Sequence, residues 1–323
     1  MRRIVIILTI SASLYPCFAG INGSVRIAAI RVSFMADETP GTTGNGSFLL
    51  NAVIDTCGRY TIDPVPHDRS YFESQLVAVN NYYRSVSYGK FGLDLDQSTV
   101  FPQTDDGSYI LTEKMDYYHP YNQTDLHDQR VTELFRDAIE TAYNNDEIDF
   151  SNYDHVVVFH AGIGQDFSLP FLGPTPEDIP STFIDGDMLQ EYVGGVLQFG
   201  TATINQGIIL PETQNHLFYQ ESENIFLNTE EPCDYQYGLT GTFALMLGFA
   251  IGLPPLWDTN SGQSGIGIFG LMDQGSNNGR GLIPSPPDAW SRKFAGWELP
   301  LILTPSIMIN LPSRSEDNLV QIP

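Results

Sequence analysis

The sequence predicts a mixed α/β protein, in which a twisted mixed sheet with helices is followed by a part rich in loops. Two observations point to this class. Segments with an apolar residue every three or four positions alternate with short β-branched runs up to about residue 250. Beyond that point glycines, prolines and other turn residues dominate, so we expect little regular structure there.

Three longer helices are expected. The first begins near Ser70, which we expect to be the N-cap, with Glu73 completing a capping box, and it runs to about Ser87. The second covers about residues 128–144, where apolar residues recur on one face. The third covers about residues 238–250 and is apolar on nearly every side, which indicates a buried helix.

Strands are expected where β-branched and aromatic residues cluster between turn signals. The clearest is the run His-Val-Val-Val-Phe-His at residues 155–160, which is typical of a strand buried on both faces. Its two histidines should face opposite sides of the sheet, because an odd number of positions separates them. Further strands are expected at residues 25–34, 91–96, 109–111 and 201–210, with loops at 36–50 and 162–182 and a short helix at 288–294.

The amino-acid composition limits the kinds of molecule that the protein is expected to bind. The chain has 323 residues, of which 42% are hydrophobic and 17% are charged, enough apolar material for one large core or two lobes. Asp and Glu number 39 against 15 Lys and Arg, so the net charge is -24. An acidic surface repels phosphate backbones, and nucleic acid is therefore not an expected partner. Excess carboxylates can bind calcium, although a solvated acidic surface is the simpler interpretation.

Residues 1–19 have the pattern of a signal peptide. Two arginines precede an apolar run, and a small residue, Ala19, marks the expected cleavage site. The run is too short to cross a bilayer, and no later stretch reaches the ~18 apolar residues that a membrane helix needs. We therefore expect a secreted mature chain with no membrane span. Its two cysteines, Cys57 and Cys233, could form a disulfide in that compartment, a pairing that the sequence leaves open.

The third helix and the segment after it carry the most specific pattern. Residues 241–259 read Gly-Thr-Phe-Ala-Leu-Met-Leu-Gly-Phe-Ala-Ile-Gly-Leu-Pro-Pro-Leu-Trp-Asp-Thr, and residues 265–275 read Gly-Ile-Gly-Ile-Phe-Gly-Leu-Met-Asp-Gln-Gly. This resembles the immune inhibitor A type of zinc metallopeptidases, whose helix carries H-E-x-x-H-x-x-G-x-x-D, followed by a Gly-Leu-Pro-like exit, an Asp-Thr-like loop and a Leu-Met turn below the metal. Segments similar to that family also occur in the same order at residues 63–72, 153–162, 207–212 and 287–297.

The resemblance implies a zincin fold of the metzincin kind, with zinc as the family's cofactor and peptide cleavage as its activity. It also implies one metallopeptidase-like domain over residues 20–323. An upper lobe would cover about residues 20–252, and a loop-rich lower lobe about residues 253–323. Family members continue beyond the strand-like stretch in which this chain ends, so we expect a fragment or a truncated gene.

At the motif positions this chain departs from the family. Gly252 occupies the position of the motif's glycine. Counting back from it places Phe249 at the second histidine, Leu245 at the first and Met246 at the glutamate. Counting forward places Pro255 at the third ligand. Every position that should hold a metal ligand or the catalytic base is therefore substituted.

These side chains cannot perform the family's chemistry. Two histidines four positions apart bind one zinc ion, which lowers the pKa of its bound water from about 16 to about 7, and the glutamate takes a proton from that water. Leucine and phenylalanine have no lone pair to donate, and a methionine thioether is no base. We expect Leu245 and Phe249 instead to pack together over the former metal position. Gly252 should end the helix, and Met272 should keep the turn below it.

The sequence thus predicts a secreted relative of these peptidases that is catalytically inactive and binds a peptide or protein without cleaving it. A bound peptide is expected to pair through its backbone along a free sheet edge at Gly207, Ile208 and Ile209. Two alternatives stay open: an active zinc endopeptidase with relocated ligands, and a non-catalytic structural or adhesive surface module. Relocated ligands would come from His160, His216, Glu212 and Asp258.

Two further sequence patterns resemble ligand-binding motifs. The sequence G-x-G-x-x-G at residues 265–270 follows no expected strand and opens no expected helix, so a dinucleotide site is not predicted. Residues 258–262, Asp-Thr-Asn-Ser-Gly, could donate oxygens to calcium, but a plain turn is the simpler interpretation.

Overall fold

The computed structural model describes most of the chain, namely residues 20–37, 39–51, 61–166, 175–216, 236–302 and 320–321. The predicted signal peptide, the two cysteines Cys57 and Cys233 and most of the last twenty residues lie outside the described residues. The predictions about export, the disulfide and the chain's end therefore stay predictions.

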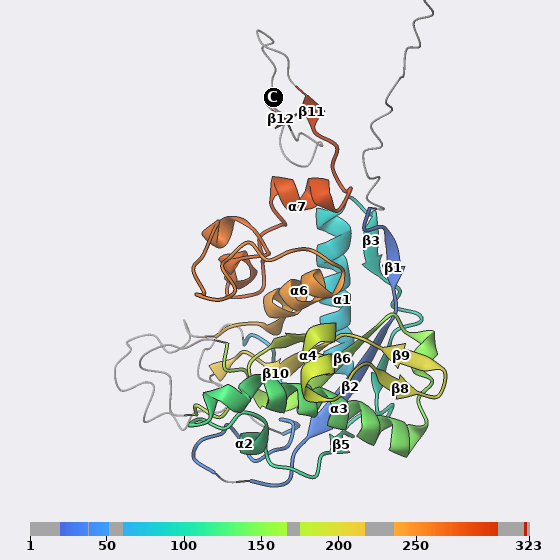
Figure 1. Cartoon of the computed structure of the whole chain (residues 1–323), viewed down its shortest axis with the longest axis vertical. Helices are drawn as coiled ribbons and strands as arrows, with labels where there is room; N and C mark the ends of the chain where they lie inside the picture. Colours follow the sequence, from blue (N-terminus) through green and yellow to red (C-terminus); the bar gives the residue numbers. More distant parts are fainter. Residues whose placement is uncertain are drawn as a thin grey trace, which may run out of the picture.

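Helices and strands alternate along the chain (Figure 1). The helices are α1 (Arg69–Val86), α2 (Met115–Tyr118), α3 (His127–Asp146), α4 (Gly186–Tyr192), α6 (Leu239–Ala250) and α7 (Ala289–Phe294). Short 3-10 turns lie at Thr124–Leu126, Phe150–Asn152, Gly267–Phe269 and Gln274–Asn277. The strands are β1 (Gly23–Val25), β2 (Ile27–Ser33), β3 (Phe91–Leu93), β4 (Thr99–Phe101), β5 (Tyr109–Ile110), β6 (His155–Ile163), β7 (Thr182–Ile184), β8 (Leu197–Phe199), β9 (Ala202–Ile204), β10 (Gly207–Thr213), β11 (Leu301–Ile302) and β12 (Val320–Gln321).

The main sheet is mixed, as the sequence predicts. Its strands follow the order β4-β2-β6-β10-β7, with β5 also paired to β2. β4, β2, β6 and β10 run parallel to one another, and β7 runs antiparallel to β10. β6 is fully buried from Val156 to Ile163, which explains why its sequence is almost continuously apolar.

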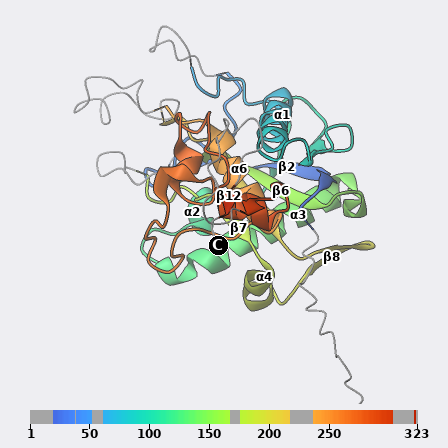
Figure 2. The ribbon, with the colours of Figure 1, turned by 90° about the horizontal axis from the view of Figure 1, so that it is seen from above.

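Helices cover both faces of this sheet. Alternate residues of a strand point to opposite faces, so the core divides into two clusters. On one face Ile27, Val157 and Phe159 pack among the apolar residues of α1 and α6, and on the other Ala28, Val156 and Val158 pack among those of α3. Figure 2 shows α1 and α3 on opposite sides of β2 and β6. Among the residues that the structure describes, no helix combines the length and apolarity needed to cross a bilayer.

The three long helices are confirmed to within a few residues, but the expected start of the first is wrong. Its N-cap is Asp68, whose carboxylate accepts a hydrogen bond from the Tyr71 backbone N–H at 3.0 Å. The Ser70 hydroxyl donates to the same carboxylate at 2.8 Å, so Ser70 belongs to the first turn and forms no capping box. An aspartate caps well because its negative charge also complements the positive end of the helix.

The end of α6 is confirmed in detail. Gly252 has a φ of 91°, a conformation that favours glycine. Its N–H donates to the Phe249 carbonyl at 2.9 Å, and the Leu253 N–H donates to the Gly248 carbonyl at 2.8 Å. This pair of bonds is a Schellman motif, which satisfies carbonyls that the helix end would otherwise leave unpaired. The expected strand over residues 201–210 is in fact two strands, β9 and β10, separated by a turn at Asn205–Gln206.

Candidate functional site

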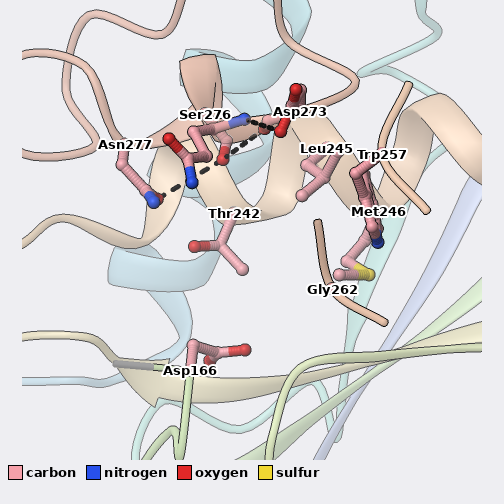
Figure 3. A pocket seen from close by; sticks show the side chains of 10 residues that line it. Asp166, Thr242, Leu245, Met246, Trp257, Gly262, Asp273, Ser276 and Asn277 are labelled. Atoms are coloured by element: carbon pink, nitrogen blue, oxygen red, sulfur yellow. Dashed lines mark hydrogen bonds between the residues drawn. The ribbon is translucent and has the colours of Figure 1, made fainter. Parts of the chain in front are cut away.

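α6 borders a cavity of about 240 Å³. Leu245 and Met246, which occupy the motif's first histidine and glutamate positions, both line it. The described residues that line it are Asp166, Thr242, Leu245, Met246, Trp257, Gly262, Asp273, Gln274, Ser276 and Asn277. Figure 3 shows these side chains arranged around the open space, with Asp166 at the opposite side from Asp273, Ser276 and Asn277. The side of α6 that carries two of the motif positions therefore faces a cavity.

Phe249 lies outside this cavity and packs against aromatic neighbours. Its ring stacks on Phe183 of β7, with centroids 5.9 Å apart and an interplanar angle of 29°. Its other contact is edge-on with Trp257, at 5.5 Å and 76°. Leu245 and Phe249 both pack against the same core, and Leu245 also lines the cavity, so their expected packing over a former metal position stays a prediction.

The residues at the remaining motif positions differ in their exposure to solvent. Pro255 is exposed and does not line the cavity. Met272 is fully buried beneath α6, and a Cβ added to Gly248 would come within 2.7 Å of its Sδ atom. Glycine at position 248 is thus what allows α6 to pack directly on Met272. Met272 thus packs against α6, and its assignment to the family's turn below the metal stays a prediction.

Asp273, on the cavity's far side, anchors the loop that contains the G-x-G-x-x-G pattern. Its Oδ2 atom accepts hydrogen bonds from the backbone N–H groups of Gly265, Ile266 and Gly267 at 2.9, 2.7 and 2.8 Å. The Ser264 hydroxyl donates to the same atom at 2.9 Å. Burial alone would raise the pKa of Asp273, but these hydrogen bonds outweigh it and lower the pKa below its usual value. The loop's N–H groups are therefore occupied by the protein's own carboxylate.

Asp166, just beyond the end of β6, has different partners. Its carboxylate accepts hydrogen bonds from the Ser181 backbone N–H at 3.0 Å, from the Ser181 hydroxyl at 2.9 Å and from the Gln214 side-chain amide. All three donors are neutral. Burial raises the pKa of Asp166 above its usual value, and the bonds from Gln214 and Ser181 oppose that rise only in part. Sequence reasoning missed this residue, because a single aspartate after a strand matches no motif.

The candidates for relocated metal ligands are dispersed. Glu212 accepts a 2.8 Å hydrogen bond from buried His67, while His160 Nδ1 lies 2.9 Å from the Ala161 carbonyl. Burial lowers the pKa of His160 and His216 to about 4 each. Asp258 caps its own exposed turn through the N–H groups of residues 260 and 261. Within the described residues, no three His, Cys, Asp or Glu side chains gather closely enough to hold a metal ion.

The expected peptide-binding edge is wrong. Gly207, Ile208 and Ile209 pair with Ile184, Phe183 and Thr182 of β7, and Ile208 and Ile209 also pair with β6 on their other side. Backbone groups bonded within the sheet cannot accept a further strand. In the part of the chain that the structure describes, β7 ends the sheet instead, and it pairs only with β10. The three-residue length of β7 is the reason that periodicity did not reveal it.

These features define a mixed α/β protein in which a buried helix and the aspartate that anchors a neighbouring loop both border a cavity. The chain matches no protein-family model, no curated protein and no solved structure.

Proposed function

We propose that this protein is a secreted pseudo-peptidase of the immune inhibitor A type, which binds peptides in the cavity beside α6 without cleaving them. The observation that carries the proposal is the cavity itself. It borders two of the motif positions, and the helix presents Leu245 and Met246 to it instead of nitrogen and oxygen donors. A thioether and an aliphatic chain cannot activate water, but they offer apolar surface to a ligand.

The strand order supports a zincin-like frame for this cavity. β7 is short, antiparallel and last in the sheet, and its Phe183 contacts α6 through Phe249. An extended peptide could therefore add to the outer edge of β7 by backbone hydrogen bonds while one of its side chains enters the cavity. In this proposal β7 takes the role that the sequence assigned to Gly207, Ile208 and Ile209.

The proposal is tested by metal content, cleavage and binding, all measured on the purified chain from residue 20 onward. After incubation with zinc and gel filtration, we expect no stoichiometric metal and no chelator-sensitive cleavage of casein. Stoichiometric zinc together with chelator-sensitive cleavage would establish the active-peptidase alternative instead.

Binding is measured by fluorescence anisotropy with fluorescein-labelled tryptic peptides of casein. We expect saturable binding that is lost in Leu245→Trp, because the larger ring fills the cavity. Val77→Trp is the matched control, since Val77 is exposed on α1 and remote from the cavity lining. If no peptide binds to the wild-type protein, the result supports the structural or adhesive alternative, and the pseudo-peptidase proposal fails.

A further inference from the structure

Asp166 contributes a carboxylate to the cavity wall, and no cation among the described residues pairs with it. Its hydrogen-bond donors are the Ser181 N–H, the Ser181 hydroxyl and the Gln214 amide. Across the described residues, no lysine, arginine or histidine forms an ion pair with it. A partly buried carboxylate bordering a cavity gains most from a ligand that brings a positive charge.

Other residues of the cavity wall suit the stem of a long basic side chain. Leu245 and Met246 offer aliphatic and thioether surface, and Trp257 offers an aromatic ring (Figure 3). Lysine and arginine bury their methylene stems on such surfaces while their charged ends reach polar partners. An indole ring also attracts a nearby cation through its π face.

The electrostatic setting favours the same ligand. None of the described residues that line the cavity is basic, and the whole chain carries a net charge of -24. A field of this sign draws cations toward the cavity and repels anions. The second carboxylate in the wall, Asp273, is already satisfied by one hydroxyl and four backbone N–H groups. Asp166 is therefore the residue that should select the ligand's charge.

We propose that the cavity beside α6 binds the side chain of a lysine or arginine in a peptide, with its positively charged end at Asp166 and its stem against Leu245, Met246 and Trp257. This inference rests on the proposed peptide-binding function of the same cavity, and it adds the ligand class and the residue that recognises it.

The test uses acetylated and amidated peptides that are identical except at one central position, which is lysine, arginine or norleucine. Blocking the termini leaves the side chain as the only cation. Affinities are measured by calorimetry with the wild-type protein, Asp166→Asn and Asp125→Asn. Asp125 is exposed in the 3-10 turn Thr124–Leu126, so its variant controls for the change in net charge.

We expect the lysine and arginine peptides to bind the wild-type protein at least about tenfold more tightly than the norleucine peptide, the effect of one charge-assisted hydrogen bond. Asp166→Asn should lower the affinity for the basic peptides to the norleucine level, and Asp125→Asn should preserve the difference. The comparison of the three peptides on the wild-type protein still tests the inference even if Asp166→Asn fails to fold.

Three results would overturn the inference. Equal affinity for all three peptides would refute basic-side-chain selection while leaving peptide binding intact. A preference for lysine that survives in folded Asp166→Asn would move the recognition to another residue. Failure of every peptide to bind would overturn the proposed function, and the inference with it.

Discussion

Phe249 of α6 stacks on Phe183 of β7, with ring centroids 5.9 Å apart. This contact joins the helix that borders the cavity to the last strand of the sheet. If the proposed resemblance holds, Phe249 stands at the position of the family's second metal-binding histidine. The stacked rings contribute packing that links the two elements.

The first prediction concerns this contact. Phe249→Ala should lower the free energy of unfolding by about 1–3 kcal/mol, less than the ~3–5 kcal/mol typical of fully buried phenylalanines, because the ring is only partly buried. Urea denaturation measures the change. Phe269→Ala, which truncates an exposed phenylalanine, is the matched control and should change stability little. Equal losses in the two variants would mean that the stack with Phe183 does not stabilise the protein.

The second prediction concerns metal binding. In Leu245→His/Phe249→His, two imidazoles would lie four positions apart on α6, a spacing that lets both reach one zinc ion. Zinc at about 100 times its dissociation constant should then stabilise the variant by about 2.7 kcal/mol. The wild-type protein and Leu245→His should show no comparable shift in thermal denaturation with zinc. If the double variant also fails to respond, the two positions do not converge.

The third prediction concerns the buried pair of His67 and Glu212, whose side chains are fully buried and 2.8 Å apart. Burial by itself lowers the pKa of His67, but the hydrogen bond and charge of Glu212 outweigh it and raise the pKa. Asp63, through its backbone carbonyl, and Tyr71, through its stacked ring, also face this imidazole. Because the folded-state pKa is raised, the pair's contribution is complete below the unfolded value of about 6.5 and declines as pH rises through the folded value.

His67→Leu should therefore cost about 3–5 kcal/mol below pH ~6.5, since it leaves the Glu212 charge buried without its partner. The difference between wild type and variant should narrow as pH rises. Urea denaturation across a pH series measures it. A difference that stays constant or widens with pH would contradict the assigned direction of the His67 pKa shift.

The fourth prediction concerns the loop anchored by Asp273. Asp273→Asn replaces a charged acceptor of one hydroxyl and four N–H groups with a neutral amide, and it should destabilise the fold by about 2–4 kcal/mol. It should also weaken peptide binding, because Asp273 itself lines the cavity. Asp258→Asn, in an exposed turn, should cost less than Asp273→Asn. Equal stability of Asp273→Asn and wild type would refute the anchoring role.

Long elements could be predicted from the sequence, whereas some short ones could not. α1, α3, α6 and β6 each contain enough residues to reveal their periodicity, and each was predicted to within a few residues. β4 and β7 contain three residues each, too few for any period to stand out. Their existence depends on partners far away in the sequence, such as Ile208 beside Phe183 of β7. The missed β7 is also why the expected peptide-binding edge was assigned to the wrong strand.

In the candidate site, too, the sequence reveals some residues and not others. The substitutions on α6 are visible in the sequence, because a leucine, a methionine and a phenylalanine lack metal-binding donors in any fold. Asp166 is not visible, because its significance comes from lining the same cavity as Trp257 and Leu245, which lie some eighty to ninety positions further along the chain.

What the sequence determined by itself is local and chemical: which atoms each side chain offers, where α6 must end at Gly252, and which segments can be helices. What the tertiary structure decided is which of those side chains meet. It placed Phe183 against Phe249, gave Asp166 only neutral partners and left a cavity beside Leu245. The physical reason is that burial, charge pairing and packing depend on distances in space, and only the folded chain sets these for residues far apart in sequence.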